Sequence, residues 1–333
     1  MTSASERRTR ITGPHNLRRT QAAALGLLCT CIITAIGAGA SWGYVRSTTD
    51  KLTPVYWPGS CTWIQADSGG TPDLPFATVQ QVLAKSVANW QTVTLDQGCS
   101  YLKMNLDPPA VSEAHLDYKN IIKFRTDKWC RPGEKNNPEM CFSEAAAAIT
   151  TVFYTSNPGQ PNDGQILDAD IELNDVNFLF VVEPSSTMAP ANRMIADLEN
   201  TLTHELGHFQ GLDHTCWDHT QPMAPIDDTG KPIPDCNDVI HPHGIPAATI
   251  IKISQATMFN YASPGETIKR MPKADDIAGI CGIYPRAKDP MSCMRPGETR
   301  AGGCNVDGRR RAAPFTLLLL LSLCAIVLAA RRR

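Results

Sequence analysis

The feature that most constrains the fold of this chain is the run HELGHFQGLDH at residues 204–214. At about 100° per residue, helix positions 204 and 208 lie roughly 40° apart around the axis, so both imidazoles face one side. Gly211 can adopt the left-handed conformation that ends a helix. The run therefore predicts a helix that ends near Gly211, followed by a turn that returns His214 toward His204 and His208.

Three neutral imidazoles around one point are a ligand set that suits zinc. His204, His208 and His214 are the predicted metal ligands, and a fourth position stays open, as hydrolytic zinc sites require. Glu205 lies beside the face of the histidines, where its carboxylate could take a proton from water. The sequence thus predicts a Zn²⁺ site with Glu205 as the catalytic general base.

The run matches the pattern HExxHxxGxxH and resembles the metzincin zinc endopeptidases. The segment ATMFNY at 256–261 looks like their methionine turn, with Met258 as an unliganded floor below the metal. The segment DDIAGI at 275–280, followed by Ile283 and Tyr284, is similar to the closing helix of the matrixins. The resemblance covers about 165–285. It implies an α+β, two-lobed fold with a twisted mixed sheet, two long helices above a cleft, the active-site helix among them, and a small lobe from Gly211 onward.

The same resemblance implies a secreted or cell-surface endopeptidase that hydrolyses extracellular proteins or peptides through a zinc-activated water. It also implies that residues 165–174 form an edge strand along which a substrate pairs. Some metzincins carry a functional tyrosine two residues after the methionine, whereas Tyr261 follows Met258 by three and is kept as a candidate oxyanion donor. The matrixin propeptide motif PRCGxPD is absent, and Cys61 is expected in a disulfide. The alternative function is a non-catalytic surface adhesion or binding module on the same scaffold.

Both ends of the chain carry an apolar run beside arginines. The run at 22–40 predicts a signal peptide, 1–40, cleaved near Ala40, with an uncleaved signal anchor as the alternative. The run at 312–330 lies between two arginine triplets and predicts a transmembrane segment. With Cys304 before it, residues 304–333 resemble the MYXO-CTERM sorting tail of myxobacterial surface proteins; a plain tail anchor is the alternative. The catalytic domain is then 41–285 and a linker is 286–303.

The net charge of -2 hides an acidic body. Setting aside eleven arginines and two acidic residues at the ends leaves 20 basic and 31 acidic residues, a charge near -11, for residues 41–303. This charge argues against a nucleic-acid partner and favours a soluble exported domain, expected to be a monomer. The tail would supply the membrane attachment.

Eight cysteines fall within the body. In an exported domain they predict four disulfides, although the sequence alone allows 105 pairings. The short loops between successive cysteines favour pairing Cys61 with Cys99, Cys130 with Cys141, Cys216 with Cys236, and Cys281 with Cys293.

Hydrophobic periodicity predicts the remaining elements. Helices are expected at 76–93, 194–210 and 274–280; strands at 101–106, 121–125 and 147–154; a half-exposed strand with one charged face at 165–174; and irregular chain at 211–262. The acidic residues Asp163, Asp168, Asp170, Glu172 and Asp175 could bind Ca²⁺, and a solvated strand face explains them equally well. A second metal at His219, His241 and His243 is possible on residue type alone, and surface loops are the favoured interpretation.

Overall fold

The computed structural model describes residues 43–295, apart from 134–137, 185–187 and 189. The predicted signal peptide, Cys304 and the predicted span at 312–330 therefore lie outside the described residues. Among the helices that are described, none combines the length and the apolar character needed to cross a bilayer.

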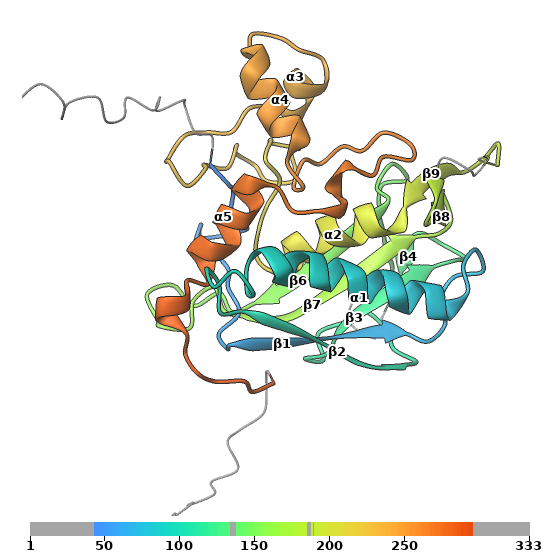
Figure 1. The fold of residues 1–333 in the computed structure, drawn as a ribbon, viewed down its shortest axis with the longest axis horizontal. Helices are drawn as coiled ribbons and strands as arrows, with labels where there is room; N and C mark the ends of the chain where they lie inside the picture. Colours follow the sequence, from blue (N-terminus) through green and yellow to red (C-terminus); the bar gives the residue numbers. More distant parts are fainter. Residues whose placement is uncertain (1–42, 134–137, 185–187, 189, 296–333) are drawn as a thin grey trace, which may run out of the picture. The chain divides into compact units, whose positions relative to one another are not determined.

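A five-stranded mixed sheet forms the base of the fold (Figure 1). Its spatial order is β2-β1-β3-β7-β6, and every neighbouring pair is parallel except β7 with β6, which is antiparallel. The strands are β1 (Cys61–Asp67), β2 (Lys103–Ala110), β3 (Asn120–Arg125), β6 (Ala148–Tyr154) and β7 (Ile166–Asn174). Together with the helices, this sheet confirms the α+β class.

Two helices lie side by side against one face of this sheet (Figure 1). Helix α1 (Phe76–Val93) has the predicted bounds, and it buries the side chains that recur at helical spacing, Val79, Leu83, Val87 and Trp90 among them. Helix α2 is Leu198–Phe209, and the indole Nε1 of Trp90 donates to the Thr203 carbonyl of α2 at 2.8 Å. The main hydrophobic core fills the space between the helices and the sheet.

The expectation of a half-exposed edge strand at 165–174 is wrong on both counts. Strand β7 is internal because β6 pairs along its outer side, and β6 is the edge strand. The charged side chains of β7, Asp168, Asp170 and Glu172, are fully buried. A loop and neighbouring strands supply their partners: backbone N–H groups at 117, 118 and 121 donate to the two aspartates, and Arg125 of β3 and Arg131 of β4 (Cys130–Arg131) pair with Glu172. The alternation of charged and apolar residues shows that the two faces of the strand differ. It does not show whether the charged face meets solvent or another part of the chain.

The predicted helix at 194–210 begins four residues late. Residues Met194–Asp197 form strand β9, parallel to β8 (Phe178–Val181), and Asp197 caps α2 by accepting the backbone N–H of Asn200 at 2.8 Å. The apolar residues Met194 and Ile195 fit a helical period, but the capping aspartate places the start of the helix at Leu198.

The segment from Gly211 onward contains more helix than predicted. It holds α3 (Cys236–Ile240), α4 (Ala247–Gln255) and the 3₁₀ turn η2 (Ile268–Arg270), while α5 (Ala274–Ile283) confirms the predicted closing helix and the 3₁₀ turn η3 (Arg286–Lys288) follows it. A second, smaller hydrophobic cluster lies in this segment and contains Cys216, Cys236, Val239, Ile253 and Phe259.

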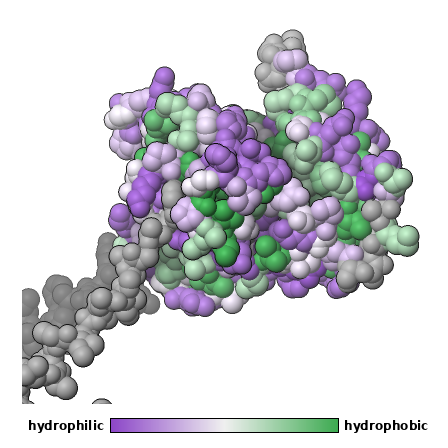
Figure 2. All heavy atoms as spheres, turned by 90° about the horizontal axis from the view of Figure 1, so that it is seen from above, coloured by the Kyte–Doolittle hydropathy of each residue, from purple (hydrophilic) through white to green (hydrophobic). Residues whose placement is uncertain are grey.

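On the face shown in Figure 2, hydrophobic residues form separate patches among hydrophilic ones.

Four disulfides use all eight cysteines of the body. Cys130–Cys141, which joins the two-residue strands β4 (Cys130–Arg131) and β5 (Met140–Cys141), and Cys216–Cys236 confirm the predicted pairs. The other two predicted pairs are wrong, because Cys61 bonds Cys293 and Cys99 bonds Cys281.

Strand alternation explains the error. Thr62, Ile64 and Ala66 alternate as buried residues of β1 up to the register shift at Asp67, which is also buried. Ile64 and Ala66 belong to the core beneath the helices, so Cys61 and Trp63 face the opposite side of the sheet. Cys99 follows α1, which packs on the face of the sheet that carries the core. Each of the two cysteines bonds a cysteine of the C-terminal segment instead.

Candidate metal centre

Helix α2 holds the side chains of His204 and Glu205 in a largely buried position. Its apolar residues Leu198, Leu202, Leu206 and Phe209 are fully buried, which fixes the rotation of the helix about its axis. His204 is 9% exposed and Glu205 is 5% exposed. Two consecutive polar residues this deep in a helix need polar partners, and each of them has one.

The turn after α2 returns the third histidine to the first two. Gly211 has a φ of 94°, a left-handed value that favours glycine, and its N–H donates to the His208 carbonyl at 2.8 Å. The Leu212 N–H donates to the Gly207 carbonyl at 3.0 Å. The chain therefore reverses within three residues, as the glycine predicted, and His214 faces His204 and His208.

The three imidazoles converge on one point through the same ring atom. The Nε2 atom of His214 lies 3.2 Å from Nε2 of His204 and 3.1 Å from Nε2 of His208. A tetrahedral zinc ion with bonds of about 2.0–2.1 Å holds its ligand nitrogens roughly 3.3–3.4 Å apart. The spacing of the nitrogens therefore suits a zinc ion.

Hydrogen bonds at the other ring nitrogens fix the tautomer of each histidine. Nδ1 of His204 donates to the Thr257 carbonyl at 2.6 Å, Nδ1 of His208 donates to the Leu212 carbonyl at 2.9 Å, and Nδ1 of His214 donates to Asp218 Oδ2 at 2.7 Å. Because these oxygens are acceptors, each Nδ1 carries the proton and each Nε2 presents a lone pair. Three lone pairs directed at one point repel one another, and a bound cation resolves that repulsion.

Burial keeps two of the candidate ligands neutral. Burial first, and then the neighbouring histidines, lower the pKa of His204 well below its ordinary value. Burial and His214 lower the pKa of His208 to about 3. A metal binds the neutral imidazole, so both residues are in the required form at neutral pH.

Met258 packs directly beneath the histidine helix. It is 1% exposed, and a Cβ added at Gly207 would lie 2.2 Å from the Met258 sulfur, so only glycine at 207 permits this contact. The Met258 carbonyl accepts the Thr215 N–H at 3.1 Å. The predicted floor residue is therefore packed against the predicted ligand helix.

Two carboxylates that the sequence analysis did not single out support the site. Asp276, in α5, accepts the backbone N–H groups of Thr257 at 2.8 Å and Met258 at 3.2 Å, which fixes the carbonyl that binds His204. Asp218 binds His214; burial opposes its ionisation, but hydrogen bonds from His214 and Thr220 outweigh burial and lower its pKa. Asp276 lies within the segment 275–280 quoted above, but the sequence did not indicate the hydrogen bonds of either aspartate, and only the fold revealed them.

Glu205 directs its carboxylate toward strand β6. Oγ1 of Thr150 donates to Glu205 Oε2 at 2.6 Å. Burial raises the pKa of Glu205 to about 7, and the Thr150 hydrogen bond acts in the opposite direction. The carboxyl group can therefore accept and return a proton near neutral pH.

Tyr261 lies on the surface beyond Met258. It is 46% exposed, and its backbone carbonyl accepts a hydrogen bond from the buried Lys269 Nζ. Its role as an oxyanion donor stays a prediction.

The three histidines considered for a second metal do not form a cluster with metal-ligand spacing in the described part of the chain. His219 pairs with Asp235, with Nε2 and Oδ2 2.6 Å apart, while His241 and His243 are exposed. In the part of the chain that is described, the only other group with metal-ligand spacing is Cys130, Glu139 and Cys141, and its cysteines form a disulfide.

The acidic residues considered for Ca²⁺ have mixed surroundings. Asp163 accepts the Thr53 hydroxyl, Asp175 binds Thr71 and Arg193, and Glu172 pairs with two arginines. Asp168 and Asp170 each retain one buried carboxylate oxygen without a partner in the described part of the chain. The calcium prediction therefore depends on these two residues.

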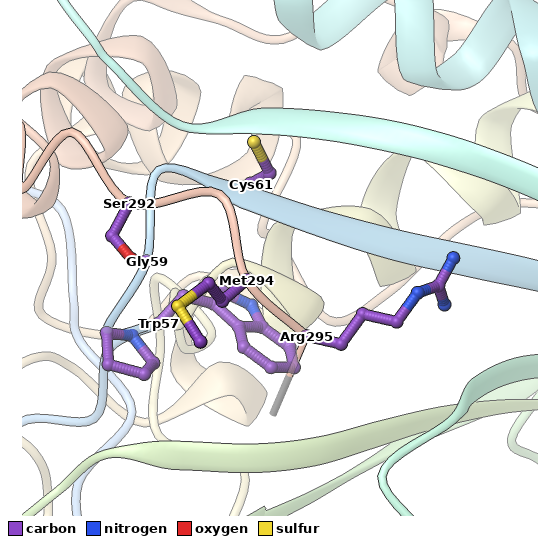
Figure 3. Close-up of a pocket in the computed structure, with 7 residues that line it drawn as sticks. Trp57, Gly59, Cys61, Ser292, Met294 and Arg295 are labelled. Carbon is purple, nitrogen blue, oxygen red and sulfur yellow. The ribbon is translucent and has the colours of Figure 1, made fainter. Parts of the chain in front are cut away.

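A cavity of about 160 Å³ lies beside the Cys61–Cys293 disulfide (Figure 3). Its lining includes Trp57, Met294 and Arg295 and none of the three histidines. Arg295 pairs with Asp107 and lies over the Trp63 ring. This cavity lacks the groups that acid–base or metal chemistry would need.

Comparison with known proteins does not identify a related family or protein. A scan against protein-family models finds no match for the chain, and a search of curated proteins finds no match either. The three converging histidines with their fixed tautomers, Glu205 and the packed Met258 are therefore the basis for a functional assignment.

Proposed function

We propose that this chain is an exported zinc-dependent endopeptidase. The observation that carries the proposal is the convergence of three Nε2 atoms, with that of His214 3.1–3.2 Å from the other two, while each Nδ1 is held by an acceptor. His204, His208 and His214 would hold the ion. The ion would supply Lewis acidity and lower the pKa of a water molecule to about 7.

The residues of the chain supply the proton transfers and the geometry. Glu205 takes a proton from the attacking water and returns it to the leaving amine, because its carboxyl lies beside the histidines and its pKa is near neutral. Thr257, Leu212 and Asp218 keep the imidazoles in one orientation. Met258 fills the space beneath the ligand helix.

An extended peptide would bind along strand β6. The sheet ends at β6, and this strand reaches the candidate base through the contact between Thr150 and Glu205. An edge strand offers unpaired backbone N–H and C=O groups that a substrate chain can pair with. This assignment replaces the role expected for residues 165–174.

The central test combines metal analysis with one substitution. The purified exported protein should contain one zinc ion per chain and cleave casein or a peptide library, and 1,10-phenanthroline should abolish cleavage. Glu205→Gln should retain zinc and lose about 10²- to 10⁴-fold in kcat, the range expected for general acid–base catalysis. Near-wild-type cleavage by Glu205→Gln would refute the mechanism.

The same test separates the enzyme from the alternative. A non-catalytic adhesion or binding module on this scaffold would bind zinc and cleave no member of a diverse peptide library. The buried glutamate beside the metal ligands favours the enzyme, because a structural zinc site needs no such base.

We also infer that the domain works outside the cytoplasm. Four disulfides are typical of proteins that fold in an oxidising compartment. The predicted signal at 1–40 and the predicted tail at 304–333 would then direct export and membrane attachment. Mass spectrometry of the mature protein checks this: loss of the N-terminal signal and of Arg333 is expected if both ends are processed.

A further inference from the structure

The side chain of Thr150, in strand β6, forms a hydrogen bond with Glu205. This bond is separate from the three candidate metal ligands and from the backbone pairing of the sheet. Its Oγ1 lies 2.6 Å from Glu205 Oε2 and 3.3 Å from the Glu205 backbone carbonyl. In the described part of the chain, it is the one side chain that hydrogen-bonds this carboxylate. The hydroxyl has a single proton, and the shorter distance and the carboxylate charge favour donation to Oε2.

The sheet holds the hydroxyl in place. Thr150 pairs with Ile171 of β7 in the antiparallel ladder, and Ile171 is fully buried. A threonine is branched at Cβ, so few rotamers are available to it within a strand. The next residue, Thr151, faces the other side of the sheet, where its Oγ1 accepts a hydrogen bond from Arg131 at 2.8 Å. Of the two adjacent threonines, only Thr150 can reach Glu205.

We propose that Thr150 is a positioning residue for Glu205, resting on the function proposed above. By occupying Oε2, its hydroxyl leaves Oε1 as the oxygen that accepts the proton from water, and it prevents the carboxylate from rotating about its terminal bond. The edge strand that would bind the substrate thereby also orients the base. One element then sets both the position of the peptide and the direction of proton transfer.

Three matched substitutions test this role. Thr150→Val removes the hydroxyl at nearly constant shape, Thr150→Ser keeps it, and Thr62→Val removes the buried hydroxyl of a threonine in β1, which β3 and β7 separate from β6. We expect Thr150→Val to bind zinc normally and to lower kcat about 10- to 100-fold with KM changed less than twofold. We expect Thr150→Ser to restore kcat to within about threefold of wild type, and Thr62→Val, in a strand that is remote from the candidate site, to leave it unchanged.

A second readout does not depend on activity. In chelator-treated protein, Thr150→Val should lower the unfolding midpoint by several degrees, and by clearly less when Glu205→Ala is already present, because the two side chains are coupled. Equal shifts in both backgrounds would overturn the contact.

These outcomes separate the two proposals. If zinc-loaded wild-type protein cleaves no peptide, the proposed function fails while the unfolding cycle still tests the contact. If wild type is active and Thr150→Val keeps full kcat, or Thr150→Ser is as impaired as Thr150→Val, the positioning role is wrong.

Discussion

At the scale of single residues, the three candidate ligands differ in the group that accepts a hydrogen bond from Nδ1. His204 and His208 donate to backbone carbonyls, whereas His214 donates to the carboxylate of Asp218. A carboxylate partner raises the basicity of the imidazole, and hence its affinity for a metal, more than a backbone carbonyl does. Unlike a backbone carbonyl, a carboxylate side chain can be removed by substitution. His214 therefore has the ligand environment that is easiest to test.

Asp218→Asn should weaken zinc binding about 10- to 100-fold, because the amide supplies less negative charge to the imidazole and fixes its tautomer less firmly. Competition with a chromophoric chelator measures the affinity. Asp235→Asn is the matched control, since Asp235 pairs with His219, which lies outside the candidate ligand set. Equal affinities for wild type and Asp218→Asn would show that the contact does not tune the site.

Asp170 should make stability depend on pH. Burial, followed by the charge of Asp168, raises the pKa of Asp170 to about 8, whereas an unfolded aspartate titrates near 3.9. The folded state therefore retains a proton that the unfolded state loses, so this contribution is complete below about pH 4 and is lost as pH rises toward 8. In urea unfolding of chelator-treated protein, Asp170→Asn should remove part of that decline.

The calcium prediction has a distinct outcome in the same experiment. If Asp168 and Asp170 bind Ca²⁺, added calcium should raise the unfolding midpoint of wild type and leave that of Asp170→Asn unchanged. Parallel pH curves for wild type and the variant, without calcium, would show that Asp170 is not the titrating group.

At the scale of secondary-structure elements, the site arises where α2, β6 and the 257–258 turn meet. Helix α2 supplies two candidate ligands and the candidate base, β6 supplies Thr150, and the turn supplies the carbonyl for His204 and the Met258 side chain. The close approach of helix and turn depends on the missing side chain at Gly207.

Gly207→Ala should destabilise the protein despite its better helix propensity. Alanine gains about 1 kcal/mol in a helix, but its Cβ would overlap the Met258 sulfur, and overpacking a core costs about 1–3 kcal/mol. Thermal unfolding of the zinc-loaded protein measures the loss. In a Met258→Ala background the same change should cost less, and an equal cost in both backgrounds would contradict the proposed clash.

At the scale of the whole described domain, two disulfides join distant parts of the chain. Cys61–Cys293 spans 232 residues and Cys99–Cys281 spans 182, so both tie early segments to the C-terminal one. Backbone hydrogen bonds support the same connection, since Ser60 donates to Ser292 at 2.7 Å and Tyr101 donates to Tyr284 at 3.0 Å. The C-terminal segment is thus part of the fold beyond the predicted domain end at 285.

Removing the longer disulfide should cost more than removing a short one. Loop-closure entropy gives about 5 kcal/mol for the 232-residue loop and about 3 kcal/mol for the 11-residue loop of Cys130–Cys141. Urea unfolding of Cys61→Ser/Cys293→Ser and of Cys130→Ser/Cys141→Ser compares the two. A greater loss for the short loop would contradict the entropic account.

The sequence alone determined the features that depend on local spacing. Helical periodicity was enough to place α1, and the spacing of 204, 208, 211 and 214 was enough to predict a helix, a turn and three converging histidines. Two disulfides with short loops were also predicted correctly. These features follow from backbone geometry within a few turns of the chain.

Only the tertiary structure decided which distant groups meet. In the folded domain, β6 is the edge strand and the acidic side chains of β7 are buried. Cys61 and Cys99 each bond a cysteine of the C-terminal segment and not one another. Thr150, Asp218 and Asp276 come to the candidate site from remote positions in the sequence. A single threonine or aspartate is part of no periodic pattern, so the sequence does not indicate which side chain it will contact. The packing of helices on the sheet determines its partners, because that packing, and not the spacing along the chain, sets distances between remote residues.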